Sequence, residues 1–240
     1  MIVDFDNVFR ENISKYTNNS IIKNSIDSAI DSILESIYDV EYILVKMYGG
    51  WHQEDILTNK ASTILSIIPD IETLFPRVYS NKKIYGSIEL AFNLSDIEHE
   101  WHYTYKEQRG LPGLRIKKDA MKDSCHANHN TCPIHILYRF IDQRKTCLTT
   151  NCSNKILDTI FMYKSQKMVD TMMACDIISA CDDPNTIGIY IMSEDIDLFP
   201  AIALGRSKNN NIPIYIRLEH TKPSNHYLMM SNKFEINILV

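Results

Sequence analysis

Acidic side chains follow two short apolar runs that are typical of buried strands. Asp4 ends the run 2–4, and Asp195 and Asp197 come shortly after the run 189–192. In an open parallel sheet, ligands bind beyond the carboxyl ends of the strands, so we expect these carboxylates to face one crevice. Carboxylates crowded in a crevice repel one another unless a cation is present, and Mg²⁺ or Mn²⁺ suits oxygen ligands. The pattern therefore predicts a divalent-metal site.

A third acidic element lies on the helix that is expected to lead into the second of these strands. It contains Asp170 and Asp176, which fall on different helix faces at about 100° per residue. We therefore expect only one of the two to bind the metal directly. Asp6 and Glu194 are further acids near the expected crevice, and Asp6 is the strongest candidate for a bystander or a helix cap.

A structural interpretation competes with the metal site. Acidic residues that follow strands are common as helix N-caps, because a carboxylate oxygen accepts a hydrogen bond from a free N–H of the first turn. Asp195 or Asp197 could cap the helix that is expected to follow them.

Strands and helices alternate along most of the chain. Extended segments are expected at 2–4, 42–48, 83–94, 187–192, 212–218 and 234–240, and helices at 13–38, 53–68, 156–180 and from about residue 198. This alternation predicts an α/β fold with an open, mainly parallel sheet that helices cover on both faces. We expect a single domain over residues 1–240, interrupted at 95–154 by an irregular insertion.

The insertion 95–154 is rich in cysteine and histidine. Four of the six cysteines fall in this segment: Cys125, Cys132, Cys147 and Cys152. Four thiolates suit a closed tetrahedral Zn²⁺ site, which would supply folding free energy to a segment with little core of its own. Buried or free thiols are the alternative. The other two cysteines, Cys175 and Cys181, lie in an apolar helical stretch and are expected to pack as small hydrophobic residues.

Positive charge is concentrated in the middle of the chain. Residues 106–167 contain twelve Lys or Arg and five Asp or Glu, a balance of +7 within a chain of net charge −5. A basic segment on an acidic body suits a protein that holds a phosphate backbone near a metal, although a solvated basic loop would give the same count. The candidate phosphate contacts are Arg115, Lys117, Lys118 and Lys167.

The chain contains no run of about 18 apolar residues and no leader with a basic start and an apolar centre. We therefore expect a cytoplasmic protein without a membrane partner.

Three motifs, in order, resemble the NYN family of PIN-like metal-dependent ribonucleases. The first is an apolar strand that ends at Asp4, with Asn7 three residues later. The second combines Lys167, Asp170 and Asp176, and the third contains Ser193, Asp195 and Asp197, followed by Pro200. Glu194 stands where the family usually has Gly, Leu198 replaces an aromatic residue, and the insertion 95–154 has no counterpart in a minimal member.

The resemblance implies a PIN-like, Rossmannoid fold and a metal-dependent nuclease, most simply an endoribonuclease acting on single-stranded or structured RNA. Asp4 would be the central ligand of Mg²⁺ or Mn²⁺, with Asp170, Asp195 and Asp197 completing the site. Asn7 and Ser193 would position the loops or a bound water. Lys167 would touch the phosphate or screen the acids.

Two other functions compete with the nuclease. The chain could be a non-catalytic RNA-binding or regulatory module of the same fold. The segment 2–8 also resembles the nucleophile motif of haloacid-dehalogenase-type phosphatases, in which the first Asp attacks phosphorus and the second acts as acid and base. That family needs a Ser or Thr before its Lys and an acidic pair at the end, and Ser193 comes after Lys167 here.

Overall fold

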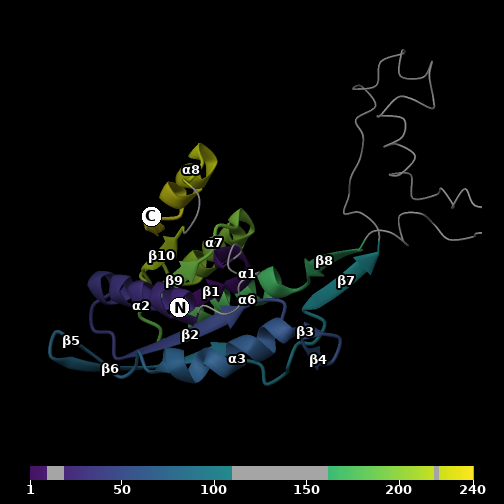
Figure 1. The fold of residues 1–240 in the computed structure, drawn as a ribbon. Coiled ribbons are helices and arrows are strands. Elements are labelled where there is room, and N and C mark those ends of the chain that lie inside the picture. Colours follow the sequence, from purple (N-terminus) through teal and green to yellow (C-terminus); the bar gives the residue numbers. More distant parts are fainter. Residues whose placement is uncertain (10–18, 110–161, 219–221, 240) are drawn as a thin grey trace, which may run out of the picture. The chain divides into compact units, whose positions relative to one another are not determined.

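A computed structural model describes residues 1–9, 19–109, 162–218 and 222–239 (Figure 1). The chain divides into two compact units. The first contains Met1–Tyr105 and Gln166–Val240, and the second contains Lys106–Ser165. All of the described residues discussed below as a site belong to the first unit.

A seven-stranded sheet forms the centre of the first unit, in the order β11-β10-β9-β1-β2-β6-β5 (Figure 1). The strands are β1 (Ile2–Asp4), β2 (Tyr42–Tyr48), β5 (Arg77–Tyr79), β6 (Lys82–Leu90), β9 (Ile189–Met192), β10 (Ile214–Arg217) and β11 (Asn237–Leu239). Neighbouring strands are parallel except β5 and β6. The expected α/β fold with a mainly parallel sheet is confirmed, and it is compatible with a Rossmann-like arrangement.

Helices accompany the sheet throughout the first unit. They are α1 (Phe5–Val8), α2 (Asn19–Ser36), α3 (Asn59–Glu72), α6 (Val169–Asp182), the 3₁₀ turn η4 (Ile196–Leu198), α7 (Phe199–Lys208) and α8 (Asn225–Lys233). The short strands β3 (His52–Gln53) and β4 (Ile56–Leu57) form a separate antiparallel pair. A further two-stranded sheet joins β7 (Tyr105–Arg109) and β8 (Met162–Gln166).

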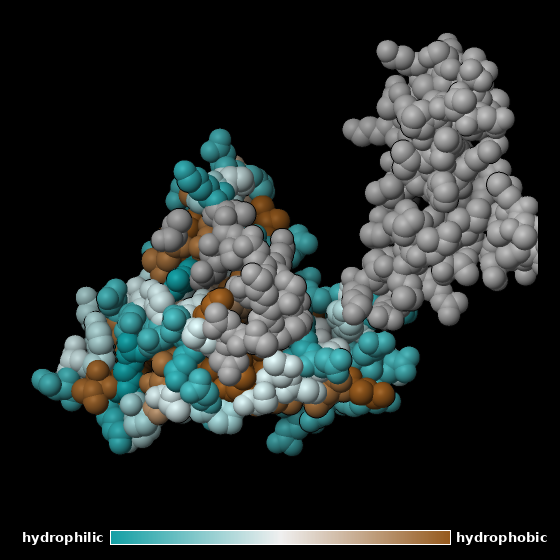
Figure 2. Space-filling model, viewed as in Figure 1, coloured by the Kyte–Doolittle hydropathy of each residue, from teal (hydrophilic) through white to brown (hydrophobic). Residues whose placement is uncertain are grey.

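Two apolar clusters, one on each face of the sheet, form the core. Val45 and Met47 of β2 belong to the cluster that contains the buried faces of α2 and α3. Ile189 and Ile191 of β9 belong to the other cluster, with α6 and α7. The alternation of side chains along a strand explains why one apolar strand supplies both layers. Apolar and hydrophilic residues are interspersed on the described surface in view (Figure 2).

The expected helix 53–68 is wrong at both ends. The helix begins at Asn59, because the side chain of Thr58 accepts a hydrogen bond from the Ala61 N–H and caps it. Residues 52–57 instead form the β3–β4 pair. The helix also continues through Pro69 to Glu72. A proline removes one backbone hydrogen bond of a helix, and the loss is small here because only three residues of the helix follow Pro69.

Two further expectations for the carboxyl-terminal half need correction. The helix expected at 156–180 begins at Val169, because Met162–Gln166 is a strand paired with β7. The sequence analysis places no helix at α8, because its short sequence mixes polar and apolar residues without a clear period. Ser224 caps this helix by accepting a hydrogen bond from the Tyr227 N–H.

The expected insertion 95–154 and the second unit have different boundaries. Residues 95–105 belong to the first unit, where the Ser95 N–H donates to Asp176 and Thr104 is buried. Among the described residues, no helix combines the length and the apolar character needed to cross a bilayer.

Candidate functional site

Asp4 lies at the carboxyl end of β1, which pairs with β2 on one side and β9 on the other. Only 4% of Asp4 is exposed. The Asn7 N–H donates to Asp4 Oδ1 at 3.2 Å, so that Asp4 caps α1, and the Ser193 hydroxyl donates to Oδ2 at 3.2 Å. Both oxygens of this buried carboxylate are therefore held from the protein side.

The loop after β9 carries the next acids to the same edge of the sheet. Ser193 follows β9 directly, and its Oγ accepts a hydrogen bond from the Asp195 N–H at 3.1 Å. Asp195 in turn caps η4, because its Oδ1 accepts from the Asp197 N–H at 2.9 Å. Asp195 therefore caps the 3₁₀ turn with one of its two carboxylate oxygens, whereas the expected helix, α7, begins after Leu198 without a side-chain cap. Asp195 is half-buried and Asp197 is exposed.

Asp170 reaches this edge from helix α6. Because α6 precedes β9 and runs back along the sheet, its first turn lies at the carboxyl ends of the strands. Asp170 belongs to that first turn and is exposed at the surface. A carboxylate is favourable there because the amino end of a helix carries partial positive charge.

The pKa values show that these carboxylates share one electrostatic environment. Burial raises the pKa of Asp4 to about 7, against the effects of its hydrogen bonds from Asn7 and Ser193, and Asp170 and Asp6 raise it further by repulsion. Partial desolvation raises the pKa of Asp170, and the charges of Asp195 and Asp197 add to this effect. A bound cation would reverse both shifts, since it favours the ionised form.

The oxygen ligands of this set suit Mg²⁺ or Mn²⁺ in chemistry. In the described part of the chain, however, no three His, Cys, Asp or Glu side chains lie close enough together to complete a metal site as they stand. Asp4 is fixed by its hydrogen bonds, whereas Asp170 and Asp197 are exposed and have room to turn. Convergence on a cation would therefore require movement of these outer carboxylates.

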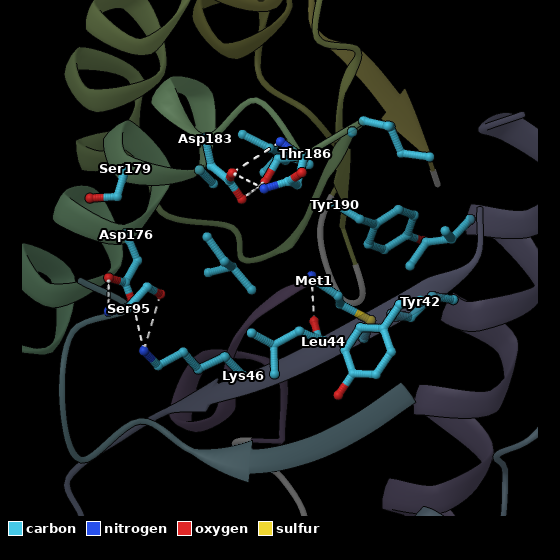
Figure 3. A pocket seen from close by; sticks show the side chains of 18 of the residues that line it. Met1, Tyr42, Leu44, Lys46, Ser95, Asp176, Ser179, Asp183, Thr186 and Tyr190 are labelled. Atoms are coloured by element: carbon cyan, nitrogen blue, oxygen red, sulfur yellow. Dashed lines mark hydrogen bonds and ion pairs between the residues drawn. The ribbon is translucent and has the colours of Figure 1, made fainter. Parts of the chain in front are cut away.

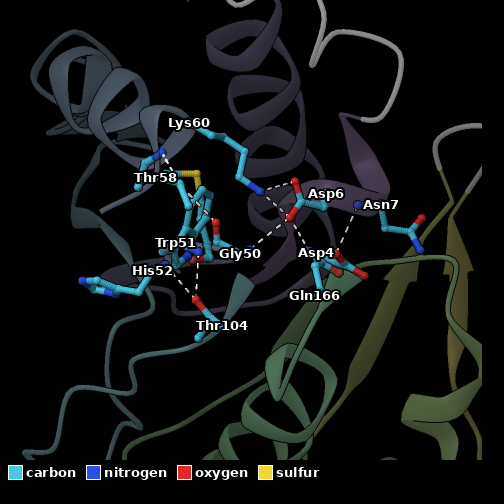
Figure 4. A network of polar contacts seen from close by, with 12 residues as sticks. Asp4, Asp6, Asn7, Gly50, Trp51, His52, Thr58, Lys60, Thr104 and Gln166 are labelled. Atoms are coloured by element: carbon cyan, nitrogen blue, oxygen red, sulfur yellow. Dashed lines mark hydrogen bonds and ion pairs between the residues drawn. The ribbon is translucent and has the colours of Figure 1, made fainter. Parts of the chain in front are cut away.

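Asp6 faces a different set of partners, which we call the Asp6 network (Figure 4). Its carboxylate pairs with Lys60, accepts a hydrogen bond from the Gln166 side chain, and accepts another from the Gly50 N–H at 3.1 Å. The ammonium group of Lys60 also lies 4.9 Å from the ring centroid of Trp51. Asp6 is therefore neither a helix cap nor a carboxylate open to a metal.

Asp176 belongs to a buried network on one face of the sheet. Lys46 Nζ lies 2.9 Å from Asp176 Oδ2, the Ser95 N–H donates to Oδ1 at 2.8 Å, and the Tyr48 hydroxyl also donates to Asp176. Lys46 and Asp176 are 3% exposed each. This carboxylate is fully engaged. Asp176 is buried and Asp170 is exposed, so the two acids lie on different faces of α6, and metal binding by Asp170 stays a prediction.

A cavity of about 440 Å³ adjoins this buried network (Figure 3). It lies toward the amino ends of β1, β2 and β9, and Asp176 is the only acid of the three motifs that lines it. The cavity is therefore separate from the Asp4 edge of the sheet.

Two buried polar atoms beside the acidic edge have no hydrogen-bond partner in the described part of the chain. They are Asn7 Oδ1 and the hydroxyl oxygen of Tyr227. Burial raises the pKa of Tyr227, and the nearby charges of Glu194 and Asp195 add to this effect. The sequence does not indicate the roles of Lys60, Gln166 and Tyr227, because nothing near them in the chain shows which distant carboxylate they approach.

Several expected residues lie outside the described residues, namely Cys125, Cys132, Cys147, Cys152, Arg115, Lys117 and Lys118. The zinc site and these phosphate contacts remain predictions. Lys167 is described and is exposed, and its N–H donates to the Thr104 carbonyl at 3.0 Å. Cys181 is buried among apolar residues as expected, whereas Cys175 is half-buried.

Comparison with protein-family models, with curated proteins and with solved structures gave no match.

Proposed function

We propose that the chain is a metal-dependent ribonuclease of the PIN-like, NYN type. The observation that carries this proposal is the position of Asp4, a buried carboxylate at the carboxyl end of a central parallel strand. Asp170 repels Asp4, and Asp195 and Asp197 repel Asp170, so carboxylates from three separate segments act on one another. Such an arrangement is costly without a cation and favourable with one.

Asp4, Asp170, Asp195 and Asp197 would hold Mg²⁺ or Mn²⁺. When bound, the ion would supply a nucleophilic water and stabilise charge on the phosphate oxygens. The Asn7 N–H and the Ser193 hydroxyl keep the Asp4 carboxylate oriented toward the site. The Oδ1 of Asn7 is buried and has no hydrogen-bond partner in the described residues, so it is an acceptor that suits a buried water.

RNA is the proposed substrate for two reasons. The family resemblance favours it, and the basic segment 106–167 supplies cations that could follow a phosphate backbone. A structural Zn²⁺ on the cysteines of this segment and a cytoplasmic location are part of the same proposal. Lys167, exposed at the start of α6, is the phosphate contact nearest in sequence to Asp170.

The phosphatase alternative fits the contacts poorly. It would require Asp6 to exchange a proton with the leaving group, as the second Asp of that motif does. Here Asp6 is paired with Lys60 and also accepts from Gly50 and Gln166, so its oxygens are already occupied.

A substrate panel tests the proposal. Purified protein is incubated with labelled single-stranded RNA, duplex DNA and a phosphomonoester, each with Mn²⁺ or with EDTA. We expect cleavage of RNA only with the metal. RNA that is bound yet stays intact under every metal condition would favour the non-catalytic RNA-binding module, and phosphate release from the monoester would favour the phosphatase.

A further inference from the structure

The segment that leads into α6 has an unusual backbone. Met168 precedes the helix with φ 65° and ψ −13°, the left-handed conformation that side chains with a Cβ rarely adopt, and it makes no side-chain cap. A residue in this conformation persists only where its surroundings hold it. Asp170, a proposed metal ligand, is two residues further on.

Two hydrogen bonds hold the residues just before Met168. The Gln166 side chain donates to the Asp6 carboxylate, and the Lys167 N–H donates to the Thr104 carbonyl at 3.0 Å. Thr104 is itself fixed, because its hydroxyl oxygen accepts from the N–H groups of Trp51 and His52, both at 2.9 Å. The approach to α6 is therefore tied to the loop after β2 and to the start of α1.

The other contacts of Asp6 make it a rigid anchor. Lys60 pairs with both of its oxygens, and the Gly50 N–H donates at 3.1 Å. Together with Gln166, three separate segments of the chain contact this one carboxylate (Figure 4). Both members of the pair are largely buried, with 10% of the Lys60 side chain and 16% of the Asp6 side chain exposed. Asp6 also lies close enough to Asp4 to raise its pKa.

We infer that Asp6 and Gln166 are positioning residues, whose hydrogen bond sets the first turn of α6 so that Asp170 can join Asp4 on the metal. This inference rests on the proposed function. Asp6 does not bind the metal here: Lys60 balances its charge, and its oxygens accept from Gly50 and Gln166. Residues that orient ligands in this way typically change metal affinity by about 10- to 100-fold when removed.

The test is a Mn²⁺ titration followed by electron paramagnetic resonance. Gln166→Ala removes the hydrogen bond without changing the charge of the site, and we expect it to weaken Mn²⁺ binding about tenfold.

Amide hydrogen exchange supplies a readout that does not depend on the metal. In Gln166→Ala, we expect faster exchange at residues 172–176, whose N–H groups form the first helical hydrogen bonds of α6, with unchanged exchange in α3. The matched control is Gln53→Ala, the same substitution at an exposed position of β3. It is expected to leave Mn²⁺ affinity and exchange unchanged.

The outcomes separate the two proposals. If the parent binds Mn²⁺ and Asp4→Asn abolishes binding, while Gln166→Ala binds as the parent does, the positioning role is overturned and the metal site stands. A parent protein that binds no Mn²⁺ would overturn both.

Discussion

The Ser193 hydroxyl donates a hydrogen bond of 3.2 Å to the Asp4 carboxylate, although the two residues are 189 positions apart in the chain. The parallel pairing of β1 with β9 brings them together, because each residue stands at the carboxyl end of its strand. This contact favours the ionised form of a carboxylate that burial otherwise drives toward protonation.

Loss of this hydroxyl should move the pH at which Asp4 ionises. In Ser193→Ala, we expect the midpoint of pH-dependent Mn²⁺ binding to rise by about one pH unit, since a pKa unit corresponds to about 1.4 kcal/mol. The measurement is Mn²⁺ affinity between pH 5 and pH 9. Ser231→Ala is the control, because Ser231 is 1% exposed and donates to the Tyr227 carbonyl instead. An unchanged midpoint in Ser193→Ala would contradict the role given to this contact.

Asp4 should make the metal-free protein less stable as the pH rises. Its pKa is raised from 3.8 to about 7, so between these values the folded chain holds a proton that the unfolded chain has lost. The stability from this group is fully present below about pH 4 and is lost as the pH rises through 7, by at most about 1.4 kcal/mol per pH unit.

Asp4→Asn has no charge to bury and should lack this dependence. Urea denaturation in EDTA at pH 5 and pH 8 measures the difference. We expect the variant to gain stability relative to the parent at pH 8, and a constant difference across this range would refute the assignment.

The ion pair of Lys46 and Asp176 should matter for folding and not for metal binding. Asp176→Ala leaves a buried ammonium group without its partner, which typically costs about 3–5 kcal/mol. Asp182→Ala removes the partner of Lys208 in a partly exposed pair and should cost less than about 1 kcal/mol. Denaturation in urea measures both, and Mn²⁺ affinity of folded Asp176→Ala should match the parent.

The Tyr227 hydroxyl should contribute nothing to the stability of the metal-free protein. Its oxygen is buried and has no hydrogen-bond partner in the described residues, while its ring lies 5.0 Å from that of Phe199. Tyr227→Phe keeps the ring and should leave the free energy of unfolding unchanged or raise it by about 1 kcal/mol. Tyr215→Phe, which loses a hydrogen bond of 2.9 Å to the Ser36 carbonyl, should lower it by about 1 kcal/mol. Equal losses in the two variants would indicate a partner for Tyr227.

Strand periodicity predicted β1 and β2 with the observed bounds, because both are short apolar runs buried within the sheet. The same reasoning failed at α8 and at β8. These short segments mix polar and apolar residues, and a cap stabilises α8 while β8 pairs with a distant strand. Local patterns carry information about periodicity, whereas caps and cross-chain pairs depend on tertiary contacts.

At the candidate site, the order of the motifs indicated which acids would meet at one edge, since parallel strands end together. It did not indicate that Lys60 would form an ion pair with Asp6 or that Lys46 would form one with Asp176. Each pairing joins residues separated by more than 50 positions. Lys46 stands within the apolar strand 42–48, so its burial follows from the sequence but its partner does not, and nothing in the local sequence distinguishes Lys60 from a solvated lysine.

The most direct test of the account is the cleavage of labelled single-stranded RNA by the parent and by Asp4→Asn, purified in parallel and compared with Mn²⁺ and with EDTA. We expect the parent to cleave only with Mn²⁺, and Asp4→Asn to lose at least about 100-fold in rate while remaining folded. Cleavage by Asp4→Asn at the parental rate, or cleavage by the parent in EDTA, would contradict the assignment of Asp4 as the centre of a metal-dependent site.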